Sequence, residues 1–432
     1  MHAATLGFTA LALGLSSLPA LAGQQSEAEG FIEGSSLRLL MRNFYFNRDF
    51  RDAGPEDQSY REEWAQGVMA FYESGFTQGT LGFGLDAHGL LGLKLDSGRS
   101  RSGADLLPVD GDDRPEDSYG SAGAALKVRL SSTELRYGDM RTEVPVFATG
   151  DSRLLPETAT GVLLSSQEIP DLALNAGHFT AYKLRDSTNH DQDLYLNYGE
   201  GRIGKSIDFI GGTYALSKQL SASLYAADFD ETWHQYYGGL QYALPLSENQ
   251  TLDFDFNLYD TRDTGKALQG EIDNQIYSFA VGYAFGAHKL TAAYQKVDGD
   301  TPFDYVGGDS IFLANSVNYS DFNGAHERSY QLRYDLNLAA YGVPGLKFSV
   351  RYIKGDGIDG SHADPSGGYA GLQGKGGEHW ERNVDLRYVV QSGAAKDLSL
   401  RLRQATHRAN EAQGEGDIDE VRLIVEYPID IF

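Results

Sequence analysis

The sequence predicts an all-β protein, a transmembrane antiparallel β-barrel of about 18 strands with long extracellular loops. Apolar and polar residues alternate with a period of two over many segments bounded by Gly, Asp and Asn. Many of these segments approach the ~9–11 residues that a tilted strand needs to cross a bilayer. Their connections alternate between short and long, which favours a membrane barrel over a β-sandwich. One large barrel therefore suits the chain better than several soluble domains.

The strands and connections follow from this pattern in chain order. Short connections at 215–218 and 284–287 are expected to be periplasmic turns. Long connections are expected to be extracellular loops, at 96–120, 141–170, 184–203, 298–310 and 355–379. A barrel of this size encloses an aqueous lumen. The expected strands cover 31–46, 61–75, 79–95, 121–131, 132–140, 171–183, 204–215, 218–229, 232–244, 250–261, 273–285, 287–297, 311–320, 328–340, 345–354, 380–391, 396–407 and 418–428.

Export to the bacterial (Gram-negative) outer membrane is predicted from both ends of the chain. Residues 1–23 form the expected signal peptide, because an apolar run ends in Ala20-Leu-Ala22, and 24–432 form the barrel. No Lys or Arg precedes the apolar run. The terminal Phe432 is the expected signal for the barrel assembly machinery. Outer-membrane lipid and lipopolysaccharide are therefore expected partners of the barrel.

Composition excludes several classes of site and partner. The chain has no cysteine, so it has neither disulfides nor thiolate metal ligands. A net charge of -25 argues against a nucleic-acid partner. The ten histidines show no ligand spacing such as His-x-His, so no metal site is predicted. No catalytic motif such as Gly-x-Ser-x-Gly is present.

Short segments along the whole mature chain carry a family likeness. They are RNFYFNRDF at 42–50, EWAQG at 63–67, GLLGLKLDSG at 89–98, DSRLLP at 151–156, GDTPFDY at 299–305, LANS at 313–316, GVPG at 342–345 and YVVQSG at 388–393. In this order they resemble the OprD-type porins of pseudomonads, also called outer-membrane carboxylate channels.

The resemblance implies a passive, 18-stranded channel that is neither an enzyme nor dependent on a cofactor. It implies one pore per chain and leaves a loose trimer open. It also implies a long third extracellular loop that folds inward and narrows the lumen, expected here over 141–170. A line of basic lumen residues would then guide the carboxylate of a small solute past the constriction.

Strand parity identifies candidates for this basic line. A carboxylate is best held by paired donors that stay charged, which favours Arg, and a pathway needs weak sites in series. Basic residues whose neighbours of opposite parity are Leu, Val or Tyr are expected to face the lumen. The alternative is that they only pair with wall carboxylates, since a lipid-facing Arg costs roughly 2–4 kcal/mol at the midplane. This basic ladder comprises Arg38, Arg42, Lys127, Arg129, Arg333, Arg351, Arg387, Arg401 and Arg403.

Two long loops supply further candidates. The tip of the third loop should pack inside the barrel because the loop is long and partly apolar. A later loop offers an acidic patch for a cationic group of a solute, although a solvated surface loop has the same composition. These candidates are Asp151, Ser152 and Arg153 in the third loop and Asp304, Tyr305 and Asp309 in the later one.

The sequence thus predicts a substrate-selective porin for the passive uptake of small solutes that carry a carboxylate. Aromatic or other cyclic carboxylates and amino acids are the candidate solutes. A channel specific for basic amino acids is the main alternative, and it requires an acidic pocket opposite the arginines. A barrel-type outer-membrane hydrolase is the less favoured one. His178 stands where the resemblance implies an arginine in many relatives. A passive structural role is the favoured interpretation, and a basic contact that is weaker or pH-dependent is the alternative.

Overall fold

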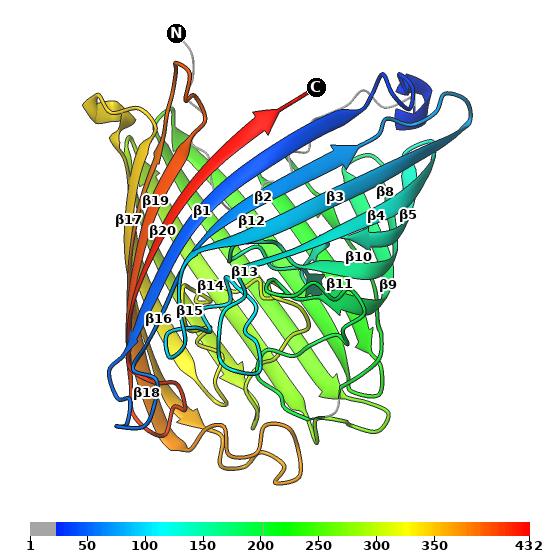
Figure 1. Cartoon of the computed structure of the whole chain (residues 1–432). Helices are drawn as coiled ribbons and strands as arrows, with labels where there is room; N and C mark the ends of the chain where they lie inside the picture. Colours follow the sequence, from blue (N-terminus) through cyan, green and yellow to red (C-terminus); the bar gives the residue numbers. More distant parts are fainter. Residues whose placement is uncertain (1–22, 202) are drawn as a thin grey trace.

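The computed structural model describes residues 23–201 and 203–432, so the expected signal peptide, apart from Gly23, lies outside the described residues. Eighteen strands form one antiparallel sheet that closes where β20 pairs with β1, which confirms the predicted fold class (Figure 1). The barrel strands are β1 (Ser36–Phe50), β2 (Tyr60–Glu73), β3 (Leu81–Asp96), β4 (Ser118–Leu130), β5 (Thr133–Met140), β8 (Thr158–Ser166), β9 (Leu172–Lys183), β10 (Ile207–Ala215), β11 (Leu220–Phe229), β12 (Trp233–Ser247), β13 (Gln250–Asp263), β14 (Asp273–Phe285), β15 (His288–Asp298), β16 (Arg328–Asn337), β17 (Leu346–Asp359), β18 (Lys375–Val389), β19 (Ser399–Ala409) and β20 (Ile418–Asp430).

Two of the predicted elements were wrong, and the errors cancel in the strand count. The segment 158–166, expected within the third loop, is strand β8. The segment 311–320, expected as a strand, is irregular chain in the loop 299–327. Its backbone is bonded by inward side chains of the wall instead of a neighbouring strand: the N–H of Ala314 donates to Ser278 and that of Asn315 to Gln295.

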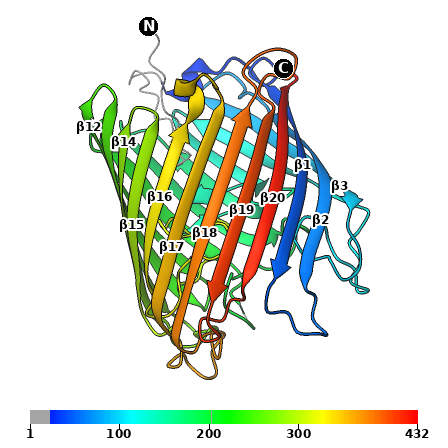
Figure 2. The same ribbon diagram turned by 90° about the vertical axis from the view of Figure 1, so that its left-hand side faces the viewer.

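The two faces of the sheet differ in chemistry. Apolar side chains such as Leu126, Ile210 and Leu224 are 61–72% exposed on the outer face, where lipid covers them in a membrane. The first described residues and the C-terminus lie at the barrel end that carries the short turns (Figure 1; Figure 2). Within the described residues, no helix is long and apolar enough to cross a bilayer.

Three long connections pack inside the barrel and fill part of it. In the loop 97–117, four backbone N–H groups donate to the carboxylate of Glu63, which β2 presents inward, at 2.8–3.2 Å. The loop 141–157 contains the small hairpin of β6 (Glu143–Val144) and β7 (Phe147–Ala148), and Phe147 is fully buried. The loop 299–327 buries Phe303 in the same core as Phe147, and its Phe322 is buried against His379 of β18. These loops narrow the lumen from the end opposite the termini.

The C-terminal strand continues further than the sequence suggested. The last strand was expected to end at residue 428, yet Pro428 pairs with Leu40 and β20 runs on to Asp430. The partner strand β19 begins at Ser399, opposite Glu426, so the residues of β20 after Glu426 have a neighbour on one side only. A proline is tolerated on such an edge because no ladder N–H is needed there.

Candidate permeation pathway

Arg42 fixes the loop 141–157 against the wall of the barrel. Its guanidinium bonds Asp151 of the loop at 2.7 Å and Glu426 of β20 at 2.8 Å. It also donates to two backbone carbonyls of the loop tip, at 2.8 and 3.2 Å. Arg42 is only 6% exposed. Its donors are therefore engaged by the protein and hold the loop tip against the wall.

Three guanidinium groups surround the ring of Phe46, and we call this cluster the basic node. The Cζ atoms of Arg48, Arg153 and Arg422 lie 5.3, 5.3 and 5.1 Å from the ring centroid. Arg48 and Arg422 come from wall strands and share the carboxylate of Glu420, at 2.7 and 2.5 Å. Arg153 comes from the inward loop. The node thus joins the loop tip to the wall at one level of the lumen.

The node holds three guanidiniums and few carboxylates to balance them. Arg153 has one carboxylate in reach, Asp105, at 3.6 Å. Burial and the neighbouring charges of Arg422 and Arg185 lower the pKa of Arg153. Burial is the larger cause of this shift, and the two neighbouring guanidiniums add to it.

The three predicted ladder residues of β16 and β19 contact only two carboxylates. Arg401 and Arg403 both contact Asp385, at 2.7 and 3.3 Å. Arg333 pairs with Asp335 at 2.6 Å and is 38% exposed. Two guanidiniums on one carboxylate leave positive charge that a solute can use.

Two further ladder residues have neutral partners. Arg351 donates to the side chain of Asn383 at 3.0 Å, and Arg387 donates to the hydroxyl of Ser399 at 3.1 Å. Strand pairing places Arg351 beside Arg333, and Arg387 beside Arg401. The wall from β16 to β20 is therefore a continuous basic strip that begins at the node and descends toward the short-turn end.

Two predicted ladder residues lie away from this strip, on β4. Lys127 pairs with Asp86 at 2.6 Å and is buried. Arg129 donates to Gln25 at 3.1 Å and covers the ring of Phe76 at 3.9 Å. Their contacts hold the N-terminal segment and the β2–β3 connection in place, and the structure does not bring them to the strip.

Arg38 lies on β1 near the short-turn end. Its side chain is 63% exposed and pairs with Asp430 at 2.8 Å. An exposed pair of this kind is weak, so Arg38 remains accessible at the end of the strip.

An acidic pair lies beside the node, on two different loops. The backbone N–H of Asp151 donates to Asp309 at 3.2 Å. Asp309 is exposed to lumen solvent, yet its carboxylate is surrounded by protein atoms and lies near Glu157, which raises the pKa of Asp309 to about 6. Ser152 accepts a hydrogen bond from Arg185 at 3.0 Å. Three predicted constriction residues, Asp151, Ser152 and Asp309, thus meet at one place.

Asp304 and Tyr305 are buried elsewhere in the same loop. Asp304 accepts backbone N–H bonds from Asn197 at 3.0 Å and Gly199 at 2.7 Å, and it is 3% exposed. Burial outweighs these bonds and raises the pKa of Asp304 to about 6. Tyr305 donates to Asp321 at 2.8 Å. These two residues clamp the loop 184–206 to the loop 299–327 and face protein.

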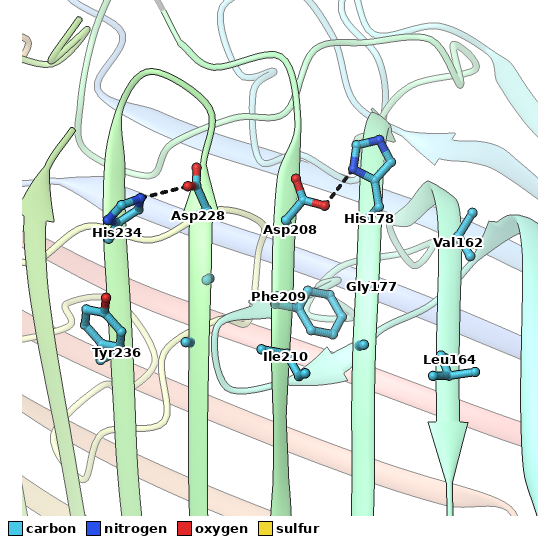
Figure 3. A pocket seen from close by; sticks show the side chains of 13 residues that line it. Val162, Leu164, Gly177, His178, Asp208, Phe209, Ile210, Asp228, His234 and Tyr236 are labelled. Atoms are coloured by element: carbon cyan, nitrogen blue, oxygen red, sulfur yellow. Dashed lines mark hydrogen bonds and ion pairs between the residues drawn. The ribbon is translucent and has the colours of Figure 1, made fainter. Parts of the chain in front are cut away.

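His178 lies on the outer wall and not in the lumen, so the alternative of a weakened basic lumen contact does not apply. It lines a groove that also holds Asp208, Asp228 and His234, and the exposed side chain of Ile210 forms part of the groove floor (Figure 3). His178 pairs with Asp208 at 2.8 Å, and His234 pairs with Asp228 at 2.7 Å (Figure 3). The groove belongs to the lipid-facing side.

The predicted basic ladder does not include two residues of the node, Arg48 and Arg422, although strand parity would have identified both. Arg48 has the same parity as Arg42 on β1, and Arg422 alternates with the outward Val421 and Leu423. The signal for both was present in the sequence. Arg185 follows the end of a strand, where parity gives no direction.

Comparison with known proteins agrees with this architecture. The model of a family described as "outer membrane porin, OprD family" matches residues 29–431. The chain belongs to the OprD family of outer membrane porins. This porin is therefore a protein of the Gram-negative outer membrane that lets small solutes pass, and it is not an enzyme. The hydrolase alternative is thereby removed.

The relatives of this porin are similar along nearly their whole length. Porin D of Pseudomonas aeruginosa is 54% identical over 423 residues, which cover 95% of this chain and 94% of the relative. A crystal structure of Pseudomonas aeruginosa OprD shares 52% identity at a TM-score of 0.84, covering 96% of this chain and all of the other. The structure of Pseudomonas aeruginosa OpdK with vanillate shares 36% identity at a TM-score of 0.84, covering 93% of this chain and all of the other.

Proposed function

We propose that this porin selects small solutes that carry a carboxylate. The observation that carries the proposal is the basic node, where Arg48, Arg153 and Arg422 surround Phe46 with one carboxylate shared between two of them. A carboxylate is held by paired guanidinium donors, and the fully buried ring of Phe46 keeps the three guanidiniums together. The solute would then pass down the basic strip, whose sites are individually weak enough to release it.

A second candidate is a solute that carries a cationic group as well, such as a basic amino acid. The acidic pair of Asp151 and Asp309 favours it, because Asp309 is exposed beside the node and can receive an ammonium or guanidinium group. The relative OpdK was crystallised with vanillate, an aromatic carboxylate, which supports the first class of solute. The two candidates differ only in whether the acidic pair takes part in binding.

Matched solutes separate the two candidates in liposome-swelling and planar-bilayer experiments. Benzamide is the neutral counterpart of benzoate, and agmatine is arginine without its carboxylate. Faster uptake of benzoate than of benzamide, and of arginine than of agmatine, is expected if the basic node selects for the carboxylate. Equal rates within both pairs would overturn the proposal. Preference for arginine over benzoate, lost in Asp309→Asn, would assign the porin to basic amino acids.

We also propose that each chain carries its own pore, that lipopolysaccharide contacts the outer wall, and that Phe432 is recognised during assembly. Phe432 is 62% exposed at the short-turn end, beside the first strand, where an assembly factor in the periplasm could reach it. Deletion of Phe432 is expected to lower the amount of folded barrel in the outer membrane. An unchanged amount would contradict this role.

A further inference from the structure

Three side chains from separate elements converge on one point at the long-loop end of the barrel. His379 of β18 and His407 of β19 are fully buried, and Nδ1 of His379 lies 2.8 Å from Nε2 of His407. Glu415, from the loop 410–417, places Oε2 at 3.3 Å from His407 Nε2 and 3.7 Å from His379 Nδ1. Two imidazole nitrogens and one carboxylate oxygen thus face each other.

The outer nitrogens of both rings are already committed. Nε2 of His379 lies 2.7 Å from a carboxylate oxygen of Glu327, and Nδ1 of His407 lies 3.0 Å from the carbonyl oxygen of Gly416. A carboxylate and a carbonyl accept hydrogen bonds, so both outer nitrogens carry the proton. In the neutral rings the inner nitrogens are then lone pairs aimed at each other. Metal-binding histidines are oriented in this way, by a carboxylate or carbonyl on the far nitrogen.

The spacing of the three inner atoms fits a tetrahedral metal ion. Ligand bonds of about 2.0–2.1 Å place neighbouring ligand atoms about 3.3–3.4 Å apart. The observed separations are 2.8, 3.3 and 3.7 Å, so the two rings need to part by about half an ångström. Glu415 is 24% exposed, which gives an ion a route from the loop side. Three protein ligands leave the fourth position to water.

We propose that His379, His407 and Glu415 bind a divalent first-row transition ion, with Zn²⁺ as the preferred one. Two imidazoles and a carboxylate are a ligand set that Zn²⁺ accepts, whereas Mg²⁺ and Ca²⁺ prefer oxygen alone. The inference concerns a site in the barrel wall and does not depend on which solute the pore admits. Ligand spacing along the chain did not reveal the site, because strand pairing and a loop bring its members together.

The site would tie the inward loop 299–327 to the wall. Phe322 of this loop stacks on His379 at 4.1 Å between ring centroids, and Tyr319 lies 4.9 Å from the ring of His407. Glu327, at the end of the loop, holds the outer nitrogen of His379. An ion bound here stabilises the folded state by mass action, and with it the packing of this loop.

Zinc binding to the purified, detergent-solubilised full chain tests the proposal. After treatment with a chelator and its removal, one Zn²⁺ per chain is expected to bind by calorimetry and elemental analysis, and the melting temperature is expected to rise. X-ray absorption should show two imidazoles on the ion. Glu415→Gln and His407→Gln should each weaken binding at least about 100-fold, more than loss of an outer-shell partner does.

The control is the double variant His178→Gln/His234→Gln, which removes both histidines of the outer groove and should bind Zn²⁺ as the wild type does. The heat-dependent gel mobility of a folded barrel shows whether each variant has folded. A wild-type chain that binds no Zn²⁺ would overturn the proposal and show that a single shared proton joins His379 to His407. Unchanged stoichiometric binding in a folded Glu415→Gln variant would also overturn it.

Discussion

Replacing Arg153 with glutamine is the most direct test of the basic node. The substitution removes one of the three guanidiniums around Phe46 and retains a polar side chain at the loop tip. The loop itself should stay in place, because Arg42 holds it through Asp151, Glu426 and two backbone carbonyls. The expected effect is therefore on carboxylate binding and not on the fold.

The size of the effect follows from the surroundings of Arg153. A charge pair at 4 Å is worth about 1 kcal/mol in bulk water and about 4 kcal/mol at the effective dielectric constant near a protein surface. The side chain of Arg153 is 11% exposed, and Arg48 and Arg422 remain to attract the solute. A charge-assisted hydrogen bond contributes about 1.5–3 kcal/mol. We take the lower bound, which corresponds to about tenfold weaker carboxylate binding.

Single-channel recording measures this directly. Benzoate on one side of a planar bilayer should alter the chloride current at a half-saturating concentration about ten times higher in Arg153→Gln than in the wild type. Arg262→Gln is the matched control, since Arg262 is 63% exposed at the end of β13 and pairs with Asp260. An unchanged half-saturating concentration in Arg153→Gln, with normal conductance, would refute the assignment of the node.

Three further predictions follow from the pathway. Arg387→Ala or Arg403→Ala should slow benzoate uptake in liposome swelling while the folded barrel remains, and unchanged uptake in both would count against the strip. Arginine uptake should fall as pH drops through about 6, because Asp309 is charged above its pKa and neutral below it, and Asp309→Asn should remove this pH dependence. Arg42→Met removes the 2.7 Å pair with Asp151, which keeps only Arg141 at 3.6 Å, and it also removes the pair with Glu426. Calorimetry should show a loss of about 3 kcal/mol, and bilayer recording should show a larger conductance from a released loop. An unchanged conductance would contradict the role of Arg42 as the loop anchor.

The sequence was sufficient for the barrel and failed where chain packs inside it. The segment 311–320 is partly buried inside the barrel, with Leu313 and Asn315 among its buried residues, so its apolar and polar residues alternate much as they do in a strand. Strand β8 has a register shift beside Gly161, which interrupts the alternation on which recognition depends. Alternation along the sequence indicates that one face of a segment is buried. Whether that segment forms a wall strand or packs inside the barrel depends on its pairing with distant strands.

Prediction of the site had the same limit. Parity correctly states which way a strand residue points, but not which wall carboxylate it will meet. Arg42 and Arg351 were equivalent in the sequence, yet one is bound by two carboxylates and the other has a neutral partner. Asp304 and Asp309 are five residues apart, and only Asp309 is exposed to the lumen. Whether a charged residue serves the solute or the fold depends on these tertiary contacts.

The net charge of the chain and the charge of its constriction are independent quantities. A net charge of -25 indicates an acidic surface, but at physiological salt a charge is screened beyond about 8 Å. The charges nearest to a solute at the node, those of Arg48, Arg153, Arg422 and the acidic pair, therefore act on it far more strongly than the net charge of the chain does. A solute that carries both a carboxylate and a positive charge could contact the basic node and the acidic pair at once. The comparison of arginine with benzoate therefore tests whether the acidic pair takes part in binding.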